Sequence, residues 1–356
     1  MLALRGVRSL CLPGQDRVIA GSGLASGSQA SAALAAESVH RALARAGLQR
    51  AGQVILLLSR EFARQADEAL RFAARTAGTL QIAGCTASGV FTEEGWQIDR
   101  PAAAALVLEA GRETTQTALS LSAQGRLAYD WLDETPRYGL VDSDGAAWQL
   151  SRVSRDTRAL CQLPGRLRPL LARGLRPLGK TFAVDANEGH ELRKIEGMSA
   201  LEHLRRQLPG ALRERPPLHR LCLLAEAEQP GIPILSINAD GSLTLAEPPS
   251  PGLPLNWALR QPLEAEREMR EQLARLAVDP TWQADFALMF SCIGRGPLFY
   301  GDDDRDLLAF REHFPGLPLL GAYGIGQIAH TRTGNRMFHN AVLTLIHEND
   351  HVQSHP

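Results

Sequence analysis

The chain has 356 residues, of which 44% are hydrophobic and 22% are charged, and its formal net charge at pH 7 is −1. This length fits two domains of ordinary size, and the composition is that of a soluble globular protein with a large core. The nearly neutral charge argues against a nucleic-acid-binding protein, which needs a basic face to neutralise phosphates.

The N-terminal stretch and the cysteines both predict a cytoplasmic protein. Arg5 and Arg8 interrupt the first apolar run, so residues 1–18 are not predicted to be a signal peptide. The sequence has no run of about 20 apolar residues, so no membrane span is expected. The five cysteines are scattered and never spaced as Cys-x-x-Cys, which predicts reduced thiols rather than disulfides or a zinc site.

The first half of the sequence predicts a strand, a helix and a second strand in series. Residues 54–58 form a continuous apolar run of the buried-strand type, and residues 66–76 are amphipathic at helical spacing. A second short strand is predicted at residues 80–83, ending in the turn Gly-Cys-Thr-Ala-Ser-Gly at 84–89. A parallel pair joined by a crossover helix is the natural arrangement. A preceding helix is expected within residues 24–46, with Ser28 or Ser31 as its cap and Gly47 at its end. Further strands are expected at 102–108, 114–122 and 138–141.

The middle of the sequence contains the predicted domain boundary. Residues 145–179 are rich in Arg and Pro and predict no clear element, and residues 174–180 mark the boundary. The first domain is therefore expected at 1–178 and the second at 179–347, with a flexible tail at 348–356. Residues 199–208 predict a helix that Ser199 caps, with Glu202 in the capping-box position. Strands are expected at 182–184, 191–195, 221–225, 232–238 and 255–260.

The last third repeats the pattern of the first half. A long amphipathic helix at 262–276 precedes a buried strand at 286–290, which ends in Ser-Cys-Ile-Gly-Arg-Gly at 291–296. A charged helix and a second strand follow, and that strand ends in a glycine-rich turn at 321–326. The repeated outline predicts an α/β fold with two related halves. Each half is a mixed β-sheet with crossover helices, and the two pack as one compact unit.

The glycine-containing segments at 84–89, 291–296 and 321–326 all lie where buried strands are expected to end. This is a position at which α/β proteins bind small ligands. Arg295 is predicted to hold a ligand carboxylate through its guanidinium, unless it pairs with the acidic run at 302–306. Tyr323 offers a ring face, and Gln327 offers an amide that both donates and accepts hydrogen bonds. The predicted ligand-binding residues are Ser59, Gly84, Cys85, Thr86, Ser88, Ser291, Cys292, Arg295, Gly321, Tyr323 and Gln327.

The motifs in the last third resemble those of the FIST family, a sensory domain of signal-transduction proteins. The matching segments are Phe-Ser-Cys-Ile-Gly-Arg-Gly at 290–296, Tyr-Gly at 300–301, the acidic helix at 302–314, Pro-Leu-Leu-Gly at 318–321, Gly-Gln-Ile at 326–328 and Phe-His-Asn at 338–340. Residues 195–201 resemble the opening motif of the C-terminal FIST domain, and residues 82–89 resemble its N-terminal partner. Two departures are Ile293, where the family often has Asn, and the missing glycine-rich stretch within 138–179.

The resemblance implies a non-enzymatic protein that senses an amino acid or another small carboxylate. No cofactor and no metal are expected, and a downstream signalling protein is the expected partner. A metal site in the tail, from His347, Asp350, His351 and His355, is the weaker interpretation of those residues.

Two other functions stay open from the sequence. A thiol-dependent enzyme would use Cys292 or Cys85 as its nucleophile and would need a nearby base, with His313, His330 and His339 as the candidates. The spacing Gly84-x3-Ser88-Gly89 does not match a hydrolase nucleophile elbow, and the glycines at 321–326 do not match a dinucleotide fingerprint. A protein-binding scaffold without a small ligand is the third possibility.

Overall fold

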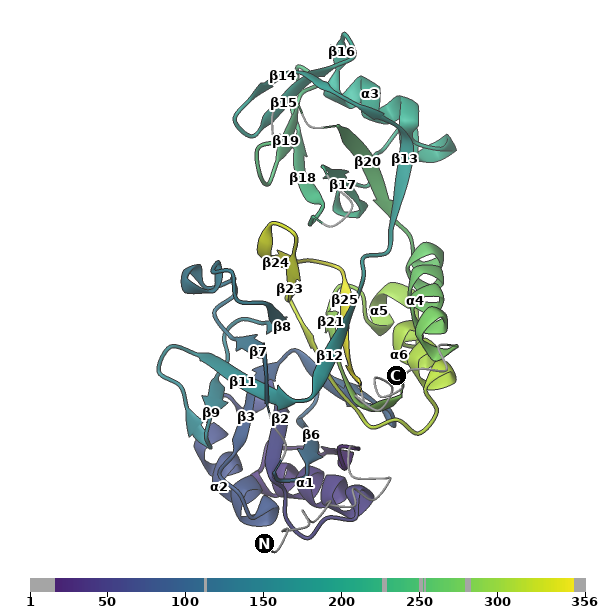
Figure 1. Cartoon of the computed structure of the whole chain (residues 1–356). Helices are drawn as coiled ribbons and strands as arrows, with labels where there is room; N and C mark the ends of the chain where they lie inside the picture. Colours follow the sequence, from purple (N-terminus) through teal and green to yellow (C-terminus); the bar gives the residue numbers. More distant parts are fainter. Residues whose placement is uncertain are drawn as a thin grey trace, which may run out of the picture.

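The chain folds into a large body and a smaller module that projects from one end of it (Figure 1). The computed structural model describes residues 17–111, 114–225, 229–249, 252, 254–278 and 283–348, and only the backbone of 114–117. The body comprises the described residues before 173 and after 261. The module comprises those from 175 to 260. Two strands, β13 and β20, connect the module to the body (Figure 1).

The first sheet of the body belongs to the N-terminal half. Its strands, in spatial order, are β1 (Ala20–Ser26), β6 (Ala102–Leu108), β2 (Gln53–Ser59), β3 (Ile82–Ala87), β9 (Ala147–Gln149) and β10 (Arg152–Val153). The predicted parallel pair is confirmed, because β2 runs parallel to β3 and α2 (Ala66–Ala77) connects them. The other helix of this half, α1 (Ala32–Ala46), follows β1.

The second sheet repeats this arrangement with strands of the C-terminal half. Its order is β12 (Arg166–Ala172), β25 (Val342–Glu348), β21 (Ala284–Cys292), β22 (Leu319–Gly324), β4 (Gly89–Thr92) and β5 (Gly95–Ile98). β21 runs parallel to β22, and the connection contains α5 (Pro297–Tyr300) and α6 (Arg305–His313). β25 lies antiparallel beside β21, as β6 lies beside β2. The internal repeat predicted from the sequence is therefore confirmed.

Strands exchanged between the halves make the body one unit. The β4–β5 hairpin of the first half completes the second sheet by pairing with β22. A third sheet also combines both halves, in the order β11 (Arg158–Pro164), β7 (Thr114–Ser122), β8 (Arg137–Val141), β23 (Gly326–Thr331) and β24 (Gly334–Phe338). The predicted α/β fold of two related halves, packed as one compact unit, is confirmed.

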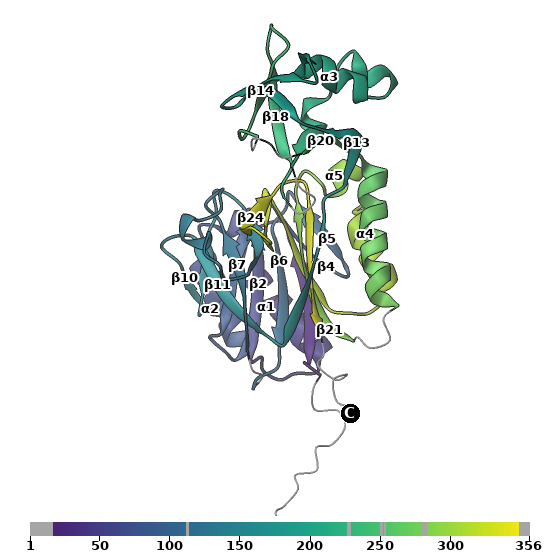
Figure 2. The ribbon, with the colours of Figure 1, turned by 45° about the horizontal axis from the view of Figure 1, so that its top comes forward.

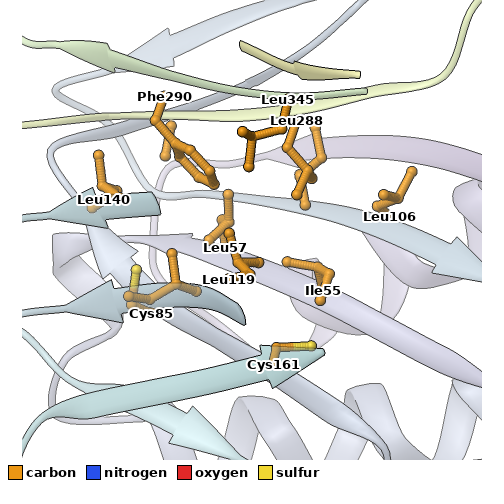
Figure 3. Packing of buried hydrophobic residues seen from close by; sticks show 14 of the residues in the cluster. Ile55, Leu57, Cys85, Leu106, Leu119, Leu140, Cys161, Leu288, Phe290 and Leu345 are labelled. Carbon is orange, nitrogen blue, oxygen red and sulfur yellow. The ribbon is translucent and has the colours of Figure 1, made fainter. Parts of the chain in front are cut away.

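The core of the body lies between the three sheets, and helices cover the outer faces of the first two. Figure 3 shows side chains of all three sheets meeting in this core, among them Ile55 and Leu57 of the first, Phe290 of the second and Leu140 of the third. α1 and α2 pack on the outside of the first sheet, whereas α4 (Pro262–Ala277) and α6 pack on the outside of the second. Figure 2 shows α4 and α2 at opposite sides of the body.

The described residues of the module form an eight-stranded sheet and the α-helix α3 (Ala200–Gln207). Its strands are β13 (Leu175–Phe182), β20 (Leu255–Arg260), β17 (Leu221–Leu224), β18 (Ile232–Ile237), β19 (Leu243–Leu245), β15 (Glu191–Ile195), β14 (Val184–Glu188) and β16 (Met198–Ser199). The predicted cap of α3 is confirmed, because the Ser199 hydroxyl accepts the Glu202 N–H. The boundary predicted between residues 178 and 179 falls inside β13.

Several strands were not predicted from the sequence. The first of them, β1, was missed because of its glycines. The chain forms β1 at 20–26, a strand that was not predicted, and α1 starts at Ala32 directly after Ser31, one of the two predicted caps. A Cβ on Gly21 would lie 2.4 Å from the Ala42 carbonyl oxygen, and one on Gly23 would lie 2.2 Å from that of Ser38. β1 therefore uses glycines to let α1 pack directly on its backbone. In the described part of the chain, no helix is long and apolar enough to cross a bilayer.

Candidate functional site

The two glycine-rich segments predicted to bind a ligand lie next to each other. The backbone continues from β3 through Ser88 into β4, and Gly89 at the start of β4 pairs with Tyr323 near the end of β22. However, most of their residues belong to strands and not to turns. β3 extends to Ala87 and β21 extends to Cys292, further than the apolar runs indicated, because small residues in these positions continue the strand pairing.

The two central glycines of these segments make space for neighbouring groups. A Cβ on Gly84 would lie 1.7 Å from the Leu56 carbonyl oxygen, and one on Gly321 would lie 2.1 Å from the Phe91 ring. Both positions are thus filled by the protein itself. We assign these glycines to packing, in place of the ligand contact predicted from the sequence.

The polar residues of the first segment bind protein groups. The Ser59 hydroxyl accepts the Ala102 N–H at 2.9 Å, and the Thr86 hydroxyl accepts the Ala146 N–H at 2.9 Å. Ser88 donates to a carboxylate oxygen of Asp142 at 2.8 Å. The bonds of Thr86 and Ser88 tie the end of the first sheet to the segment that follows β8, whereas the bond of Ser59 lies within the sheet.

Asp142 is a buried charge that the sequence analysis did not single out as a site residue. Its carboxylate is 1% exposed and forms an ion pair with the half-exposed Arg60. It also accepts the Ser143 N–H at 2.9 Å. The signal in the sequence was the Asp142-Ser143-Asp144-Gly145 run, which predicts a turn after a strand but not the partner of its carboxylate.

The two candidate nucleophiles are poorly suited to thiolate chemistry. Cys85 is fully buried in the central core (Figure 3), and burial raises the pKa of its thiol well above the usual value. Burial also raises the pKa of the Cys292 thiol. The Cys292 Sγ lies 3.7 Å from the Ile325 carbonyl oxygen, which His339 contacts through Nδ1 at 2.9 Å. Cys292 and His339 thus contact the same carbonyl oxygen, but the raised pKa keeps the proton on the thiol.

Arg295 has a structural role in place of the predicted ligand contact. It is 1% exposed, and its guanidinium makes two bonds of 3.0 Å to the Asp306 carboxylate. The same guanidinium donates to the carbonyl oxygens of Ala172 at 2.7 Å and Ala265 at 3.1 Å. These contacts satisfy its charge and most of its donors, so the pairing with the acidic run is the interpretation that the structure supports.

The side chains of Tyr323 and Ser291 are also turned into the protein. The Tyr323 hydroxyl donates to Asp304, and its ring packs against Phe91 with 4.8 Å between ring centroids. Tyr323 therefore offers no free ring face for stacking. Ser291 is fully buried, and its hydroxyl lies 3.4 Å from the Cys292 carbonyl oxygen.

Gln327 differs from the other predicted residues, because its buried amide has no partner. The side chain is 0% exposed, and neither Oε1 nor Nε2 has a hydrogen-bond partner among the described residues. Gln327 lies on β23, two residues from Ala329 and so on the same face of that strand. Buried polar atoms are nearly always bonded, to protein or to ordered water, so this amide needs a partner from outside the described groups.

Ala329 lines a pocket of about 340 Å³ in the body. The pocket lies where β8, β12, β23, β25 and α4 meet. Its lining residues are Tyr138, Pro169, Leu171, Arg173, Glu268, Gln272, Ala329, His330, Thr331 and Leu343. This volume is in the range of sites that hold small molecules.

On the α4 side, the pocket presents a carboxylate and an amide. Glu268 accepts the backbone N–H groups of Arg173 at 2.9 Å and Gly174 at 2.5 Å. Gln272, one helical turn later, donates to the Leu171 carbonyl oxygen at 3.1 Å and to Glu268 at 3.3 Å. The Gln272 Oε1 atom is buried and has no hydrogen-bond partner among the described residues. Gln272 is also one of the residues that line the pocket.

The other walls of the pocket carry a cation, a histidine and a phenol. Arg173 donates from Nη1 to the Gln229 carbonyl oxygen at 3.2 Å, and no ion pair of Arg173 occurs in the described part of the chain. His330 Nδ1 lies 3.0 Å from the amide oxygen Oδ1 of Asn335, and this oxygen accepts the hydrogen bond. In the neutral imidazole, Nε2 is therefore the ring nitrogen that can accept a hydrogen bond. Burial raises the pKa of Tyr138, whose hydroxyl therefore stays protonated at neutral pH.

This pocket was not predicted from the sequence, because its residues come from five separate elements. Arg173 lies in the Arg- and Pro-rich stretch for which no element was expected. Glu268 and Gln272 lie one turn apart on α4, which the sequence predicted from its apolar positions and not from these polar ones. The described residues contain no group of three or more His, Cys, Asp or Glu side chains suited to a metal. Of the tail residues considered for a metal, His347 lies buried beside Asp285, and Asp350, His351 and His355 lie outside the described residues.

The fold and this pocket define an α/β protein of two interlocked halves, with a small-molecule-sized site next to an inserted module. Residues 200–330 match the FIST C domain family, a match that runs from α3 of the module through β21 and β22 into β23. The resemblance predicted from the sequence is therefore confirmed over residues 200–330. The matched family is one of sensory, signal-transduction proteins.

The chain also aligns with curated bacterial proteins over 217 residues. An uncharacterized protein of Mycobacterium bovis and one of Mycobacterium tuberculosis are each 29% identical, over 55% of this chain and 56% of theirs. A further uncharacterized protein of Mycobacterium tuberculosis is 25% identical, over 55% of this chain and 57% of its own. The chain spans about half the length of the curated relatives it matches.

Proposed function

We propose that this protein is a cytoplasmic sensor that binds a small ligand non-covalently in the pocket between β12, β23 and α4. The observation that carries the proposal is that polar groups with unused bonding capacity converge on this pocket. Arg173 supplies a cation without a carboxylate partner in the described structure, and Gln272 supplies a buried acceptor without a donor. Pockets with a few convergent polar groups are the usual sites of small ligands.

The polar groups match the two ends of an amino acid. A ligand carboxylate would pair with the Arg173 guanidinium, which suits planar, bidentate recognition. A ligand ammonium would donate to Oε1 of Gln272 and to the Glu268 carboxylate beside it. Apolar groups of Leu171, Leu343 and Ala329 line the remaining wall and would contact the ligand side chain.

Gln327 does not line the pocket, but it lies on the same face of β23 as the lining residue Ala329. It was predicted to bind the ligand, and its two amide atoms have no partner among the described residues. A ligand atom or an ordered water that reaches it from the Ala329 side of β23 would satisfy the amide. Gln327 is the one residue of the original set that we retain as a proposed ligand contact.

The pocket is also connected to the module, which a sensor needs for output. The described loop residue Gln229, between β17 and β18, accepts from Arg173 and donates to Thr333 at 2.6 Å. Arg336 donates to the Gln229 side chain at 3.4 Å. Because Arg173 both lines the pocket and holds Gln229, a ligand on Arg173 would change how the module is held.

A thermal-shift screen against amino acids and small carboxylates tests the proposal. Ligand that binds the native state raises the melting temperature by mass action, and we expect at least one compound to do so. Arg173→Gln should lose the shift, whereas Arg176→Gln should keep it, because Arg176 is exposed and does not line the pocket. A panel without any shift, or a shift that survives in Arg173→Gln, would contradict the proposal and favour a scaffold without a small ligand.

A further inference from the structure

A second hollow lies on the outside of the first sheet, on the side of the body opposite α4. It is an open groove of about 600 Å³ along α2 and the loop that leads into β3. Its residues are Arg50, Leu70, Arg71, Ala74, Arg75, Gly78, Thr79, Leu80, Gln81 and Ser151. We call these residues the α2 groove.

The α2 groove combines positive charge with exposed apolar surface. Arg50, Arg71 and Arg75 are exposed, and none of them forms an ion pair within the part of the chain that the structure describes. None of the described residues that line the groove is acidic, although the chain as a whole has a net charge of −1. Leu80 is 68% exposed, and Phe72 on the adjacent face of α2 is 40% exposed. Exposed apolar groups rimmed by charge mark interaction sites more often than plain surface.

The groove is held in shape by backbone contacts. Gly78 ends α2 in the left-handed conformation, with φ of 66°. Arg50 donates to the Gly78 carbonyl oxygen at 2.9 Å, and Ser151 donates to that of Leu80 at 3.0 Å. The bond from Ser151 fixes the backbone at Leu80, so the exposed leucine is presented from an ordered loop.

We propose that the α2 groove docks an acidic amphipathic segment of a partner protein. Leucine-like side chains of that segment would cover Leu80 and Ala74, and its carboxylates would face the three arginines. Charge complementarity of this kind speeds association and selects the partner. A protein segment fits better than nucleic acid, because the basic patch is short and its centre is apolar. The docking is separate from the pocket on the other side of the body, so either proposal can fail without the other.

Fluorescence anisotropy with the full chain tests this docking. The probe is a short labelled peptide with leucines every three or four residues and glutamates between them. The comparison probes are the same peptide with lysine in place of glutamate, and a single-stranded oligonucleotide. We expect the glutamate peptide to bind best, and to bind at least about tenfold more weakly to Arg71→Glu/Arg75→Glu. Leu80→Ser should also weaken binding.

A matched variant separates the groove from overall charge. Arg155→Glu/Arg215→Glu makes the same change of charge at exposed arginines outside the groove, and it should bind the peptide like the natural chain. Three results would overturn the proposal: no binding of the glutamate peptide, equal loss in both double variants, or stronger binding of the oligonucleotide. Circular dichroism of each variant shows whether the fold is intact.

Discussion

Gln327 and Arg295 are both buried polar side chains, but only Arg295 has its partners within the protein. The Arg295 guanidinium is bonded to a carboxylate and two carbonyl oxygens, whereas the Gln327 amide has no partner among the described residues. A buried group without a partner carries its full desolvation cost. Gln327 therefore lowers the stability of the fold relative to an apolar residue of the same size. Residues of binding sites often have such a cost, because they are selected for binding and not for stability.

Replacing Gln327 with leucine should stabilise the protein and weaken ligand binding. We expect Gln327→Leu to raise the free energy of unfolding by about 1–3 kcal/mol, because it removes two unsatisfied polar atoms at similar volume. Urea denaturation measures this change. Gln29→Leu is the control, since Gln29 is exposed and should change stability by less than about 0.5 kcal/mol. A marked loss of stability in Gln327→Leu would show that the amide has a partner after all.

Asp304 gives a pH dependence at the scale of one carboxyl. Burial, with Asp306 close by, raises its pKa from 3.8 to about 6. The folded state therefore binds a proton that the unfolded state has lost, and this contribution to stability is complete below pH 4 and lost as the pH rises through 6. Asp304→Asn keeps the cap of α6 but cannot titrate.

The measurement is the free energy of unfolding from pH 4 to pH 7 in both proteins. Relative to Asp304→Asn, the natural chain should lose on the order of 2–3 kcal/mol over this range. Parallel curves for the two proteins would mean that Asp304 does not titrate here.

Among the elements, the connections at the top of the second sheet depend on one ion pair. Arg295 follows β21, Asp306 is in α6, Ala172 ends β12, and Ala265 is in the first turns of α4. One guanidinium thus joins four elements, including the helix and the strand that form walls of the pocket. Arg295 therefore does not line the pocket, but it holds in place two of the elements that do, β12 and α4.

Breaking this ion pair should unfold the second half more easily. Arg295→Met leaves Asp306 buried without its cation, and we expect a loss of about 3–5 kcal/mol of stability. Arg295→Met/Asp306→Leu should lose less, because no buried charge remains uncompensated. Thermal and urea unfolding of both variants test this order. If the single variant were as stable as the natural chain, the structural role of Arg295 would be wrong.

At the scale of the whole molecule, Gln229 is the contact through which the module reaches both Arg173 and the β23–β24 hairpin. Gln229→Ala removes the bonds to Thr333 and Arg336, and we expect the module to become more mobile relative to the body. Labels on the exposed Arg215 and Arg155 positions would report this by fluorescence energy transfer, as a broader distance distribution. An unchanged distribution in Gln229→Ala would remove Gln229 from the connection between pocket and module.

The sequence predicted the elements whose signal is local. The continuous apolar runs at 54–58 and 286–290 predicted β2 and β21, and the Ser199 and Glu202 pair predicted the start of α3. β1 was missed because Ala-Gly-Ser-Gly-Leu-Ala-Ser contains the glycines that α1 requires for close packing, and these look like a turn. The strands of the β4–β5 hairpin are specified by pairing with β22, which is distant in sequence.

The site was harder to predict than the fold, for a physical reason. A glycine-rich segment after a strand has the same composition whether it binds a ligand or makes room for Phe91 and Leu56. The pocket residues Arg173, Glu268 and His330 carry no common motif, since tertiary packing alone brings them together. The missing hydrogen bonds of the Gln327 amide likewise have no signature in the sequence. They depend on which polar groups the fold places beside the amide, and none of the described groups bonds to it.

The most direct test of the account is a crystal structure of the chain with the compound that raises its melting temperature most. We predict that the ligand lies between β12, β23 and α4, with its carboxylate on Arg173 and a donor group on Gln272. A ligand found instead beside Cys292 and Asn340 at the end of β21, or on the module alone, would contradict the proposed site.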